Sequence, residues 1–386
     1  MTAVHCVTPT TPEDASEVMR AAAATATNVR PRGAGTKFGW GRPIDEPNLE
    51  ISTARLDRII EHNEGDLTAV LEAGVPLQRA QEAFARAGQM LTLDPPLGDN
   101  DAATIGGIVA TADQGPLRHR YGACRDLLLG VTVVLPDGTL ARSGGKVIKN
   151  VAGYDLAKLY AGSFGTLGLI VEVIVRLQPQ PVKQLTLMCE TDDAESFPRA
   201  PLLLSHAALE MDCLDVGWRD GTGTLMALFR GAFPEGRAQA AARLLEPTGM
   251  TVTTTEGVAP WAEQRARQRA SEGAVVRVSG RATDLFTVIE CAQRTGATLV
   301  GRAGLGISWL SLPASEPNTL ISAIEEMRSE LSPRACVLLD APEEVRAGVD
   351  VWGREHDEGA LALMRRVKSR FDPAGLCSPG RFLGGI

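Results

Sequence analysis

The chain has 386 residues, of which 44% are hydrophobic and 22% charged, and this predicts a globular protein of two or three domains with a sizeable core. The formal net charge is −8 and the sequence has no basic run, which argues against a nucleic-acid partner. No apolar run approaches the ~20 residues that cross a bilayer, and the N-terminus lacks a signal-peptide pattern. We therefore expect a cytoplasmic protein that is peripheral to a membrane only through its partners.

Cysteine and histidine usage argues against a metal centre. The seven cysteines are widely spread and form no C-x-x-C pair, and the five histidines are equally isolated. These spacings exclude a cysteine-ligated iron–sulfur cluster within this chain, and no metal site is predicted.

The chain up to residue 92 has the pattern of a small α/β unit. Thr11, followed by Pro12 and two acidic residues, is typical of a helix start. The apolar residues after Pro76 recur on one helical face, which predicts a second helix. Short apolar runs between polar turns predict strands at Val29–Arg32, Leu49–Ser52, Ile59–His62 and Thr68–Leu71.

A glycine-rich loop follows the first of these strands. In Arg32–Thr36, R-G-A-G-T, bare amides and a guanidinium could wrap a diphosphate, whereas the alternative is a surface loop that contains glycines. A Rossmann G-x-G-x-x-G fingerprint is excluded because Gly33, Gly35 and Gly39 are spaced one residue too widely. No helix pattern opens after the loop either.

The stretch Ala103–Leu177 groups its glycines at strand ends and helix starts. Gly106 and Gly107 follow a threonine and precede an apolar run, so we expect their amides to face an anion. The same stretch predicts strands at 127–135, 139–142 and 169–177.

A short helix is predicted over Tyr154–Tyr160. Its Tyr154 and Lys158 have the Y-x-x-x-K spacing of short-chain dehydrogenases. Without a Rossmann fingerprint, a solvated helix face is the preferred interpretation of this pair.

Pro179 and Pro181 mark a domain boundary. Beyond them, mixed strands and helices predict an antiparallel sheet with helices on one face. Gly359–Phe371 predicts a final helix, which Asp372-Pro373 ends.

Several blocks together resemble a known family. P-R-G-A-G-T at Pro31, A-T-I-G-G-I-V-A-T at Ala103, K-N-V-A-G-Y-D-L at Lys149 and G-S-F-G-T-L-G-L-I at Gly162 resemble the FAD-binding domain of the vanillyl-alcohol-oxidase-type, or PCMH-type, flavoproteins. Among these, the chain is most similar to the FAD-binding subunits of bacterial glycolate oxidases. The resemblance is strong over residues 1–180 and resumes at Phe371–Phe382.

The resemblance implies an α+β fold and a domain order. An FAD-binding domain, 1–180, would contain subdomains of about 1–92 and 93–180, and an α+β cap domain would follow at 181–345. A C-terminal segment, 346–386, would return to the FAD domain. The residues implied to bind FAD are Arg32, Gly33, Ala34, Gly35, Thr36, Thr104, Gly106, Gly107, Thr111, Gly168, Ile170, Val171 and Arg381.

The sequence also departs from the family pattern. Members with covalently bound flavin often carry a histidine in the first loop, where this chain has Thr36-Lys37, so the resemblance implies FAD bound non-covalently. Members that oxidise 2-hydroxy acids carry a G-H-x-G-D-G-N-x-H block, and the best local match is G-R-A-G-L-G-I-S-W at Gly301–Trp309. The usual asparagine before the C-terminal Pro-Gly is Ser378. The catalytic residues are therefore left unassigned; Arg302, Tyr154 and His356 are the remaining candidates for substrate or proton handling.

The function implied is that of an FAD-binding subunit in a multi-subunit 2-hydroxy-acid dehydrogenase, with glycolate as the expected substrate. Its expected partners are a paralogous FAD-containing catalytic subunit and an iron–sulfur subunit, because this chain has no ligands for a cluster. Two alternatives remain open. One is a self-sufficient flavin oxidase or dehydrogenase of a sugar or hydroxy acid, and the other is a non-catalytic scaffold subunit.

Overall fold

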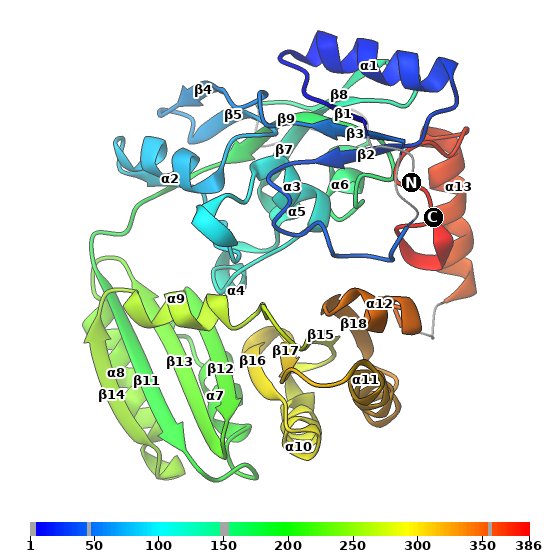
Figure 1. Ribbon diagram of the computed structural model, residues 1–386. Coiled ribbons are helices and arrows are strands. Elements are labelled where there is room, and N and C mark those ends of the chain that lie inside the picture. The colour runs from blue at the N-terminus through cyan, green and yellow to red at the C-terminus, as the bar shows by residue number, and fades with distance from the viewer. Residues whose placement is uncertain (1–4, 45–47, 147–153, 354–356) are drawn as a thin grey trace. The chain divides into compact units, whose positions relative to one another are not determined.

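The computed structural model describes residues 5–44, 48–146, 154–353 and 357–386. The chain divides into two compact units (Figure 1). The first comprises residues 1–114, 122–180 and 356–386, and the second comprises 115–121 and 181–355. The short segment 115–121 therefore belongs to the second unit although it interrupts the first, which the sequence patterns did not indicate.

The smaller sheet of the first unit is parallel. Its strand order is β1 (His5–Val7), β3 (Leu49–Ser52), β2 (Val29–Arg32). Helix α1 (Pro12–Ala24) begins as predicted, because the Thr11 hydroxyl accepts a hydrogen bond from the Asp14 amide at 3.0 Å. Its buried residues share a core with those of β2 and β3.

The larger sheet of the first unit is antiparallel and has five strands. Their order is β4 (Ile59–Asn63), β5 (Thr68–Glu72), β9 (Leu169–Arg176), β7 (Leu128–Val134), β8 (Leu140–Gly144). Two strands from before residue 92 thus pair with three from after it, so strand pairing crosses the expected subdomain boundary. The reason is burial: all five residues of β5 are buried, and a buried strand needs hydrogen-bonded neighbours on both edges.

Short helices and a two-stranded ladder complete this unit. The ladder pairs β6 (Gln89–Met90) with β10 (Gln178–Pro179). The helices are α2 (Leu77–Ala85), α3 (Ile105–Thr111), α5 (Cys124–Leu127), α6 (Ala157–Tyr160) and α13 (Glu358–Phe371). The helix expected over 154–160 is thus confined to its second half. Tyr154 is 93% exposed, as expected for a residue on a solvated face. Lys158 differs from that expectation, because its ammonium donates a hydrogen bond to the Leu128 carbonyl at 2.6 Å.

The second unit contains one antiparallel sheet of eight strands. Its order is β14 (Thr251–Glu256), β11 (Gln184–Thr191), β13 (Thr222–Arg230), β12 (Cys213–Arg219), β16 (Thr298–Arg302), β17 (Ile307–Leu312), β15 (Ala274–Ser279), β18 (Ala335–Asp340). The remaining helices are α4 (Arg118–Tyr121), α7 (Arg199–His206), α8 (Pro234–Leu245), α9 (Ala259–Ala266), α10 (Leu285–Thr295), α11 (Pro317–Leu331) and α12 (Glu343–Gly348). The predicted α+β class is confirmed.

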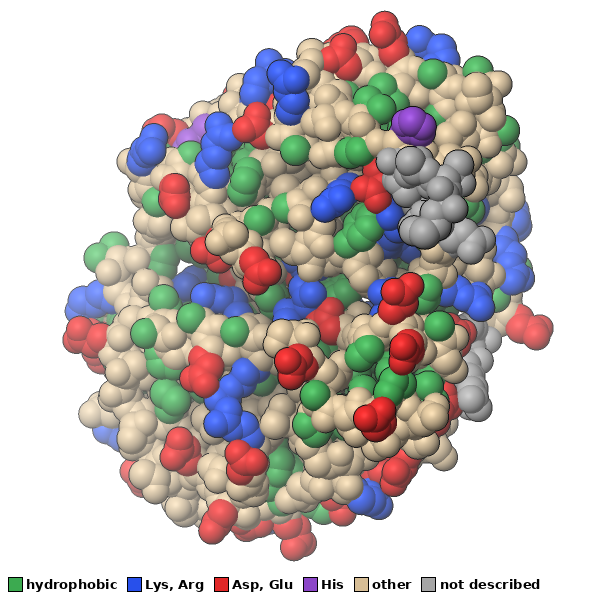
Figure 2. All heavy atoms as spheres, viewed as in Figure 1, with side chains coloured by type: hydrophobic (Ala, Val, Ile, Leu, Met, Phe, Trp, Pro, Cys, Tyr) green, Lys and Arg blue, Asp and Glu red, His purple; other side chains and the backbone are tan. Residues whose placement is uncertain are grey.

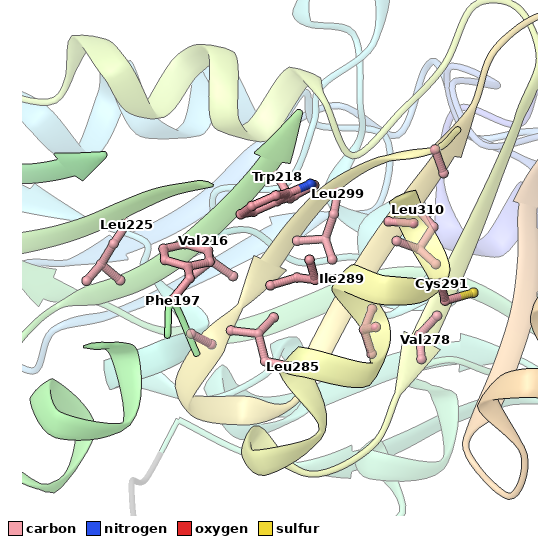
Figure 3. Close-up of a cluster of buried hydrophobic side chains, with 14 of the residues drawn as sticks. Phe197, Val216, Trp218, Leu225, Val278, Leu285, Ile289, Cys291, Leu299 and Leu310 are labelled. Atoms are coloured by element: carbon pink, nitrogen blue, oxygen red, sulfur yellow. The ribbon is translucent and has the colours of Figure 1, made fainter. Parts of the chain in front are cut away.

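One face of this sheet carries a continuous hydrophobic core. Figure 3 shows side chains of the sheet, among them Val216, Leu299 and Leu310, together with Ile289 of α10 in this cluster. Helices α7, α8, α10, α11 and α12 each contribute to it. The expectation that helices lie on one face only is wrong, because α9 packs on the opposite face. The Trp261 indole donates to the Thr186 hydroxyl at 2.9 Å, and Thr186 points away from the core residue Leu187 that follows it.

Acidic and basic side chains are interspersed on the face drawn in Figure 2. No described helix combines the length and apolar character that a membrane span requires.

Candidate FAD site

The candidate site lies in the first unit and consists of two adjoining cavities. The larger encloses about 560 Å³ of empty space and the smaller about 370 Å³, counting open solvent within them. The residues common to both cavities are Pro31, Arg32, Gly33, Gly107, Ala110 and Gly165. The loop after β2 and helix α3 therefore form the boundary between the two cavities.

The loop after β2 can approach α3 closely because it lacks side chains. A Cβ on Gly33 would lie 2.2 Å from the Thr104 hydroxyl oxygen, well inside contact distance. Gly35 has φ +81°, a left-handed conformation that glycine adopts without strain. The alternative of an ordinary surface loop is therefore disfavoured, since this loop is the wall of a cavity.

Helix α3 is held in place by its own first turn. The Thr104 hydroxyl accepts a hydrogen bond from the Gly107 amide at 3.3 Å and thereby caps the helix. The Gly106 amide donates to the Ala73 carbonyl at 2.8 Å, and a Cβ on Gly106 would lie 2.6 Å from that of Ala73. The expectation that the Gly106 amide faces an anion is thus wrong. This glycine instead permits close packing of α3 against the end of β5.

The charge of the larger cavity favours an anionic ligand. Arg32, Lys37 and Arg381 are among its lining residues, which include no acidic side chain. Arg32 is held by Glu50, whose carboxylate lies 3.3 Å from its guanidinium and does not line the cavity. The half-exposed Arg32 side chain retains N–H donors beyond that contact. Of the three cations, Arg32 lines both cavities, and a diphosphate is the kind of group that its guanidinium recognises.

The C-terminal segment completes the larger cavity. Leu376 and Ser378 exchange backbone hydrogen bonds with Val29 of β2, at 2.9 and 2.8 Å. Arg381 is 7% exposed and its guanidinium donates to the Phe38 carbonyl at 2.7 Å. Strand-like pairing of the C-terminal segment with β2 therefore brings Arg381, the arginine of the C-terminal Pro-Gly-Arg, to the glycine-rich loop.

The structure brings nearly all of the sequence-predicted residues to this site. Those lining the larger cavity are Arg32, Gly33, Ala34, Gly35, Thr36, Thr104, Gly107, Thr111 and Arg381, and those lining the smaller include Gly106, Gly168 and Ile170. Val171 lines neither cavity, because it is fully buried and its carbonyl accepts a hydrogen bond from the Ala73 amide at 2.8 Å. Sequence reasoning did not include Lys37, Phe38, Phe164, Thr53 and Ala73, which also line the cavities. Two signals could have indicated some of them: Lys37 and Phe38 adjoin the glycine-rich loop, and Phe164 lies in the G-S-F-G block.

The glycine-rich block of the second unit does not present a ready substrate site. Arg302 is fully buried, and its guanidinium forms a 2.5 Å ion pair with the equally buried Asp215. The guanidinium also lies 4.8 Å from the centre of the Trp309 ring. These three residues lie on the sheet face opposite the hydrophobic core, since Val216, which follows Asp215, belongs to that core. Arg302 therefore already has a carboxylate partner within its own unit.

The other catalytic candidates are not gathered into a site. His356 lies outside the described residues. Tyr154, at 93% exposure, has no hydrogen-bonded neighbour that would orient its hydroxyl among the contacts described. The structure adds one histidine, His119, whose ring would lie 3.0 Å from a Cβ on Gly304 of the same block. Burial lowers the pKa of His119 from its usual value, so the neutral imidazole is favoured there.

The buried Asp215 predicts a distinct pH dependence of stability. Burial raises the pKa of Asp215 to about 6, and the opposing charge of Arg302 only partly counters this. The pKa of this carboxyl in the unfolded chain is 3.8, so the folded state binds its proton more tightly than the unfolded state does. The protonated Asp215 therefore stabilises the fold fully below pH 3.8, and this stabilisation is lost as the pH rises through about 6. Urea unfolding across that range should show the loss in the wild type and not in Asp215→Asn, which is neutral throughout. An identical pH dependence in both proteins would contradict this assignment.

The residues present fit FAD. The glycine-rich loop forms a cradle that a Cβ would fill, and the Arg32 guanidinium, which belongs to a residue lining both cavities, suits a diphosphate. Phe38 and Phe164 add apolar surface to the larger cavity, against which an aromatic ring can pack.

Comparison with known proteins identifies the class. Residues 3–144 match the family model described as FAD binding domain, and residues 348–382 match that described as FAD linked oxidases, C-terminal domain. The chain therefore contains an FAD binding domain and a segment similar to the C-terminal domain of FAD linked oxidases. FAD is its cofactor.

Three relatives illustrate the range of the family. The chain is 36% identical over 51% of its length to glycolate oxidase subunit GlcE of Escherichia coli, and 30% identical over 63% of its length to a D-lactate dehydrogenase of Archaeoglobus fulgidus. Each alignment spans only 57% of the relative. An uncharacterized FAD-linked oxidoreductase of Mycobacterium tuberculosis is 26% identical over 98% of the chain and 91% of its own length.

A solved structure shares the fold. An alkyldihydroxyacetonephosphate synthase superposes on 97% of this chain and 75% of its own with a TM-score of 0.72. Because the sequence identity is 15%, this likeness concerns the fold alone.

Proposed function

We propose that the chain is the FAD-binding subunit of a multi-subunit dehydrogenase that oxidises a small 2-hydroxy acid, most specifically glycolate. The observation that carries this proposal is the glycine-rich block of the second unit. In that block the only cation, Arg302, is buried against Asp215, so the block offers no free cation to a substrate carboxylate. The likeness to a glycolate oxidase subunit supports a role within a complex.

FAD would span the two cavities. The diphosphate would lie where they meet, at Arg32, Gly33 and the first turn of α3, because these residues line both cavities or adjoin them. The isoalloxazine half would occupy the larger cavity, which holds Phe38 and Phe164, and the adenosine half would occupy the smaller one. When bound, FAD supplies the hydride acceptor for oxidation at the α-carbon of the acid.

The chain's own residues would bind and orient the cofactor. Arg32 offers a guanidinium to the diphosphate while Glu50 fixes its direction. Arg381, nearly buried and anchored on the Phe38 carbonyl, excludes water from the larger cavity. Proton removal from the substrate hydroxyl and electron transfer onward would fall to the partners, a paralogous FAD-containing subunit and an iron–sulfur subunit.

A second candidate function is a self-sufficient hydroxy-acid dehydrogenase. The likeness to a D-lactate dehydrogenase, whose name mentions no subunit, favours it. A non-catalytic scaffold that retains FAD is the third possibility, and turnover measurements separate the three.

The isolated chain is expected not to reduce its flavin with glycolate or D-lactate at a useful rate. A positioned general base typically contributes ~10²–10⁴-fold, and neither the buried Arg302 nor Trp309 can serve as one. Anaerobic rapid mixing of the holo-chain with each acid, followed by flavin absorbance, tests this. Bleaching only after the partner subunits are added supports the proposed complex. Bleaching by the chain alone would favour the self-sufficient enzyme, and no bleaching of this chain's flavin in the active complex would favour the scaffold.

FAD is expected to be bound non-covalently. Within the described loop 32–38, no histidine or cysteine is present to form a covalent link to the flavin ring. Acid precipitation of the yellow protein should leave the flavin in the supernatant, as judged by its absorbance. Flavin that remains in the washed pellet would contradict non-covalent binding.

A further inference from the structure

A buried ion pair includes one of the residues that line the larger cavity. The Lys37 ammonium lies 3.1 Å from the Asp113 carboxylate and also donates to the Pro96 carbonyl at 3.1 Å. The two charged residues are 6% and 5% exposed. Lys37 thereby connects three separate segments, namely the glycine-rich loop, the chain after β6 and the residue that follows the C-terminal cap of α3.

The two charges are placed unequally with respect to the cavity. Lys37 lines the larger cavity and not the smaller one, whereas Asp113 lines neither. Lys37 is therefore the member of the pair that borders the larger cavity. The centre of the Trp40 ring lies 6.0 Å from the Lys37 ammonium.

Helix α3 separates this pair from the diphosphate region. Thr104 caps the start of α3, beside Gly33, while Asp113 follows its end. At 1.5 Å per residue, the helix spans about 10 Å between those two points. A cofactor whose diphosphate lies at Gly33 would thus have a different part of its structure beside Lys37.

A structural tie between segments does not by itself explain this pair. A buried ion pair loses much hydration, and apolar residues of similar volume often hold segments together at least as well. A buried charge pair of which Lys37 alone borders the cavity has a further consequence, because charge effects are strong where water is excluded.

We propose that Lys37 faces the isoalloxazine half of FAD and raises its redox midpoint potential, while Asp113 holds the ammonium in place and moderates its charge. Reduction adds negative charge to the cofactor, and a nearby cation favours the more negative state. The proposal rests on the placement of the flavin half in the larger cavity. It does not depend on the identity of the substrate or of the partners.

The test compares four variants of the FAD-loaded full-length chain. Lys37→Met removes the cation, Asp113→Asn removes the anion, Lys37→Met with Asp113→Leu removes both, and Lys37→Arg keeps the charge. The midpoint potential would be measured by anaerobic dye-linked reductive titration, which needs no substrate. FAD affinity and the thermal midpoint of unfolding would be measured on the same samples.

The expected potentials move in opposite directions. Lys37→Met should lower the potential and Asp113→Asn should raise it, although both should lower the thermal midpoint, because each leaves one buried charge unpaired. The double variant should recover most of the stability and still show a lowered potential. Lys37→Arg should remain closest to the wild type. A merely structural role would lower stability in the single variants without this reversal of sign in the potential.

Two results would overturn the proposal. One is an unchanged potential in the double variant, which would place the adenosine half, or solvent, beside Lys37. The other is a shift of the same sign in both single variants. If a single variant does not retain FAD, the midpoint potential of the double variant still tests the proposal. A lowered potential means that Lys37 faces the flavin, and an unchanged potential means that it does not. Loss of glycolate oxidation with unchanged potentials would concern the proposed function and not this inference.

Discussion

Replacing Arg302 with methionine is expected to destabilise the second unit by about 3–5 kcal/mol, because it leaves Asp215 buried and without its charge partner. Both side chains are fully excluded from solvent, so neither can regain hydration unless the sheet opens. The effect is large relative to a typical stability of about 5–15 kcal/mol. The free energy of unfolding from urea titration at pH 7 is the measurement that tests this.

A matched double variant separates the pair from its surroundings. Arg302→Met combined with Asp215→Leu removes both charges and keeps similar volumes, so stability should return close to that of the wild type. Lys158→Met, which removes an ammonium of the first unit, should leave unfolding of the second unit unchanged. A double variant as unstable as the single one would show that the pair is not the source of the effect.

Replacing Gly106 with valine is expected to weaken FAD binding by about 100-fold. A Cβ at this position would lie 2.9 Å from the Ala73 carbonyl oxygen and 3.1 Å from the Ala73 Cα, and backbone cannot rotate away as a side chain could. Overpacking of this kind costs about 1–3 kcal/mol, and α3 must move to relieve it. Because each 1.4 kcal/mol of lost binding energy lowers affinity tenfold, a loss of 3 kcal/mol corresponds to about 100-fold.

A glycine with free space provides the control. Gly145 has no atom within 4 Å of an added Cβ and has no positive φ, so Gly145→Ala should bind FAD like the wild type. Quenching of flavin fluorescence on titration gives both dissociation constants, and circular dichroism reports whether the fold persists. Wild-type affinity in Gly106→Val would contradict the importance of the contact between α3 and Ala73.

Local sequence predicted the parts of the FAD site that depend on backbone chemistry. The glycines at positions 33 and 35 follow a strand, and Thr104 caps a helix, because these residue types have strong local conformational preferences. The antiparallel sheet of the second unit was predicted for a similar reason. Alternation of apolar residues with period two follows from strand geometry alone.

Only the tertiary structure decided which distant residues meet. The ion pairs of Lys37 with Asp113 and of Arg302 with Asp215 join residues 76 and 87 positions apart, and no local preference encodes such pairings. The fully buried β5 required neighbours on both edges, which brought strands from both sides of residue 92 into one sheet. Gly106 has the local pattern of an anion-binding residue. Because it packs against Ala73, its amide instead donates a hydrogen bond to the Ala73 carbonyl. Sequence patterns thus determined backbone conformation and the cofactor class. Long-range packing determined which charges are buried, which amides are already bonded, and which side chains face the cavities.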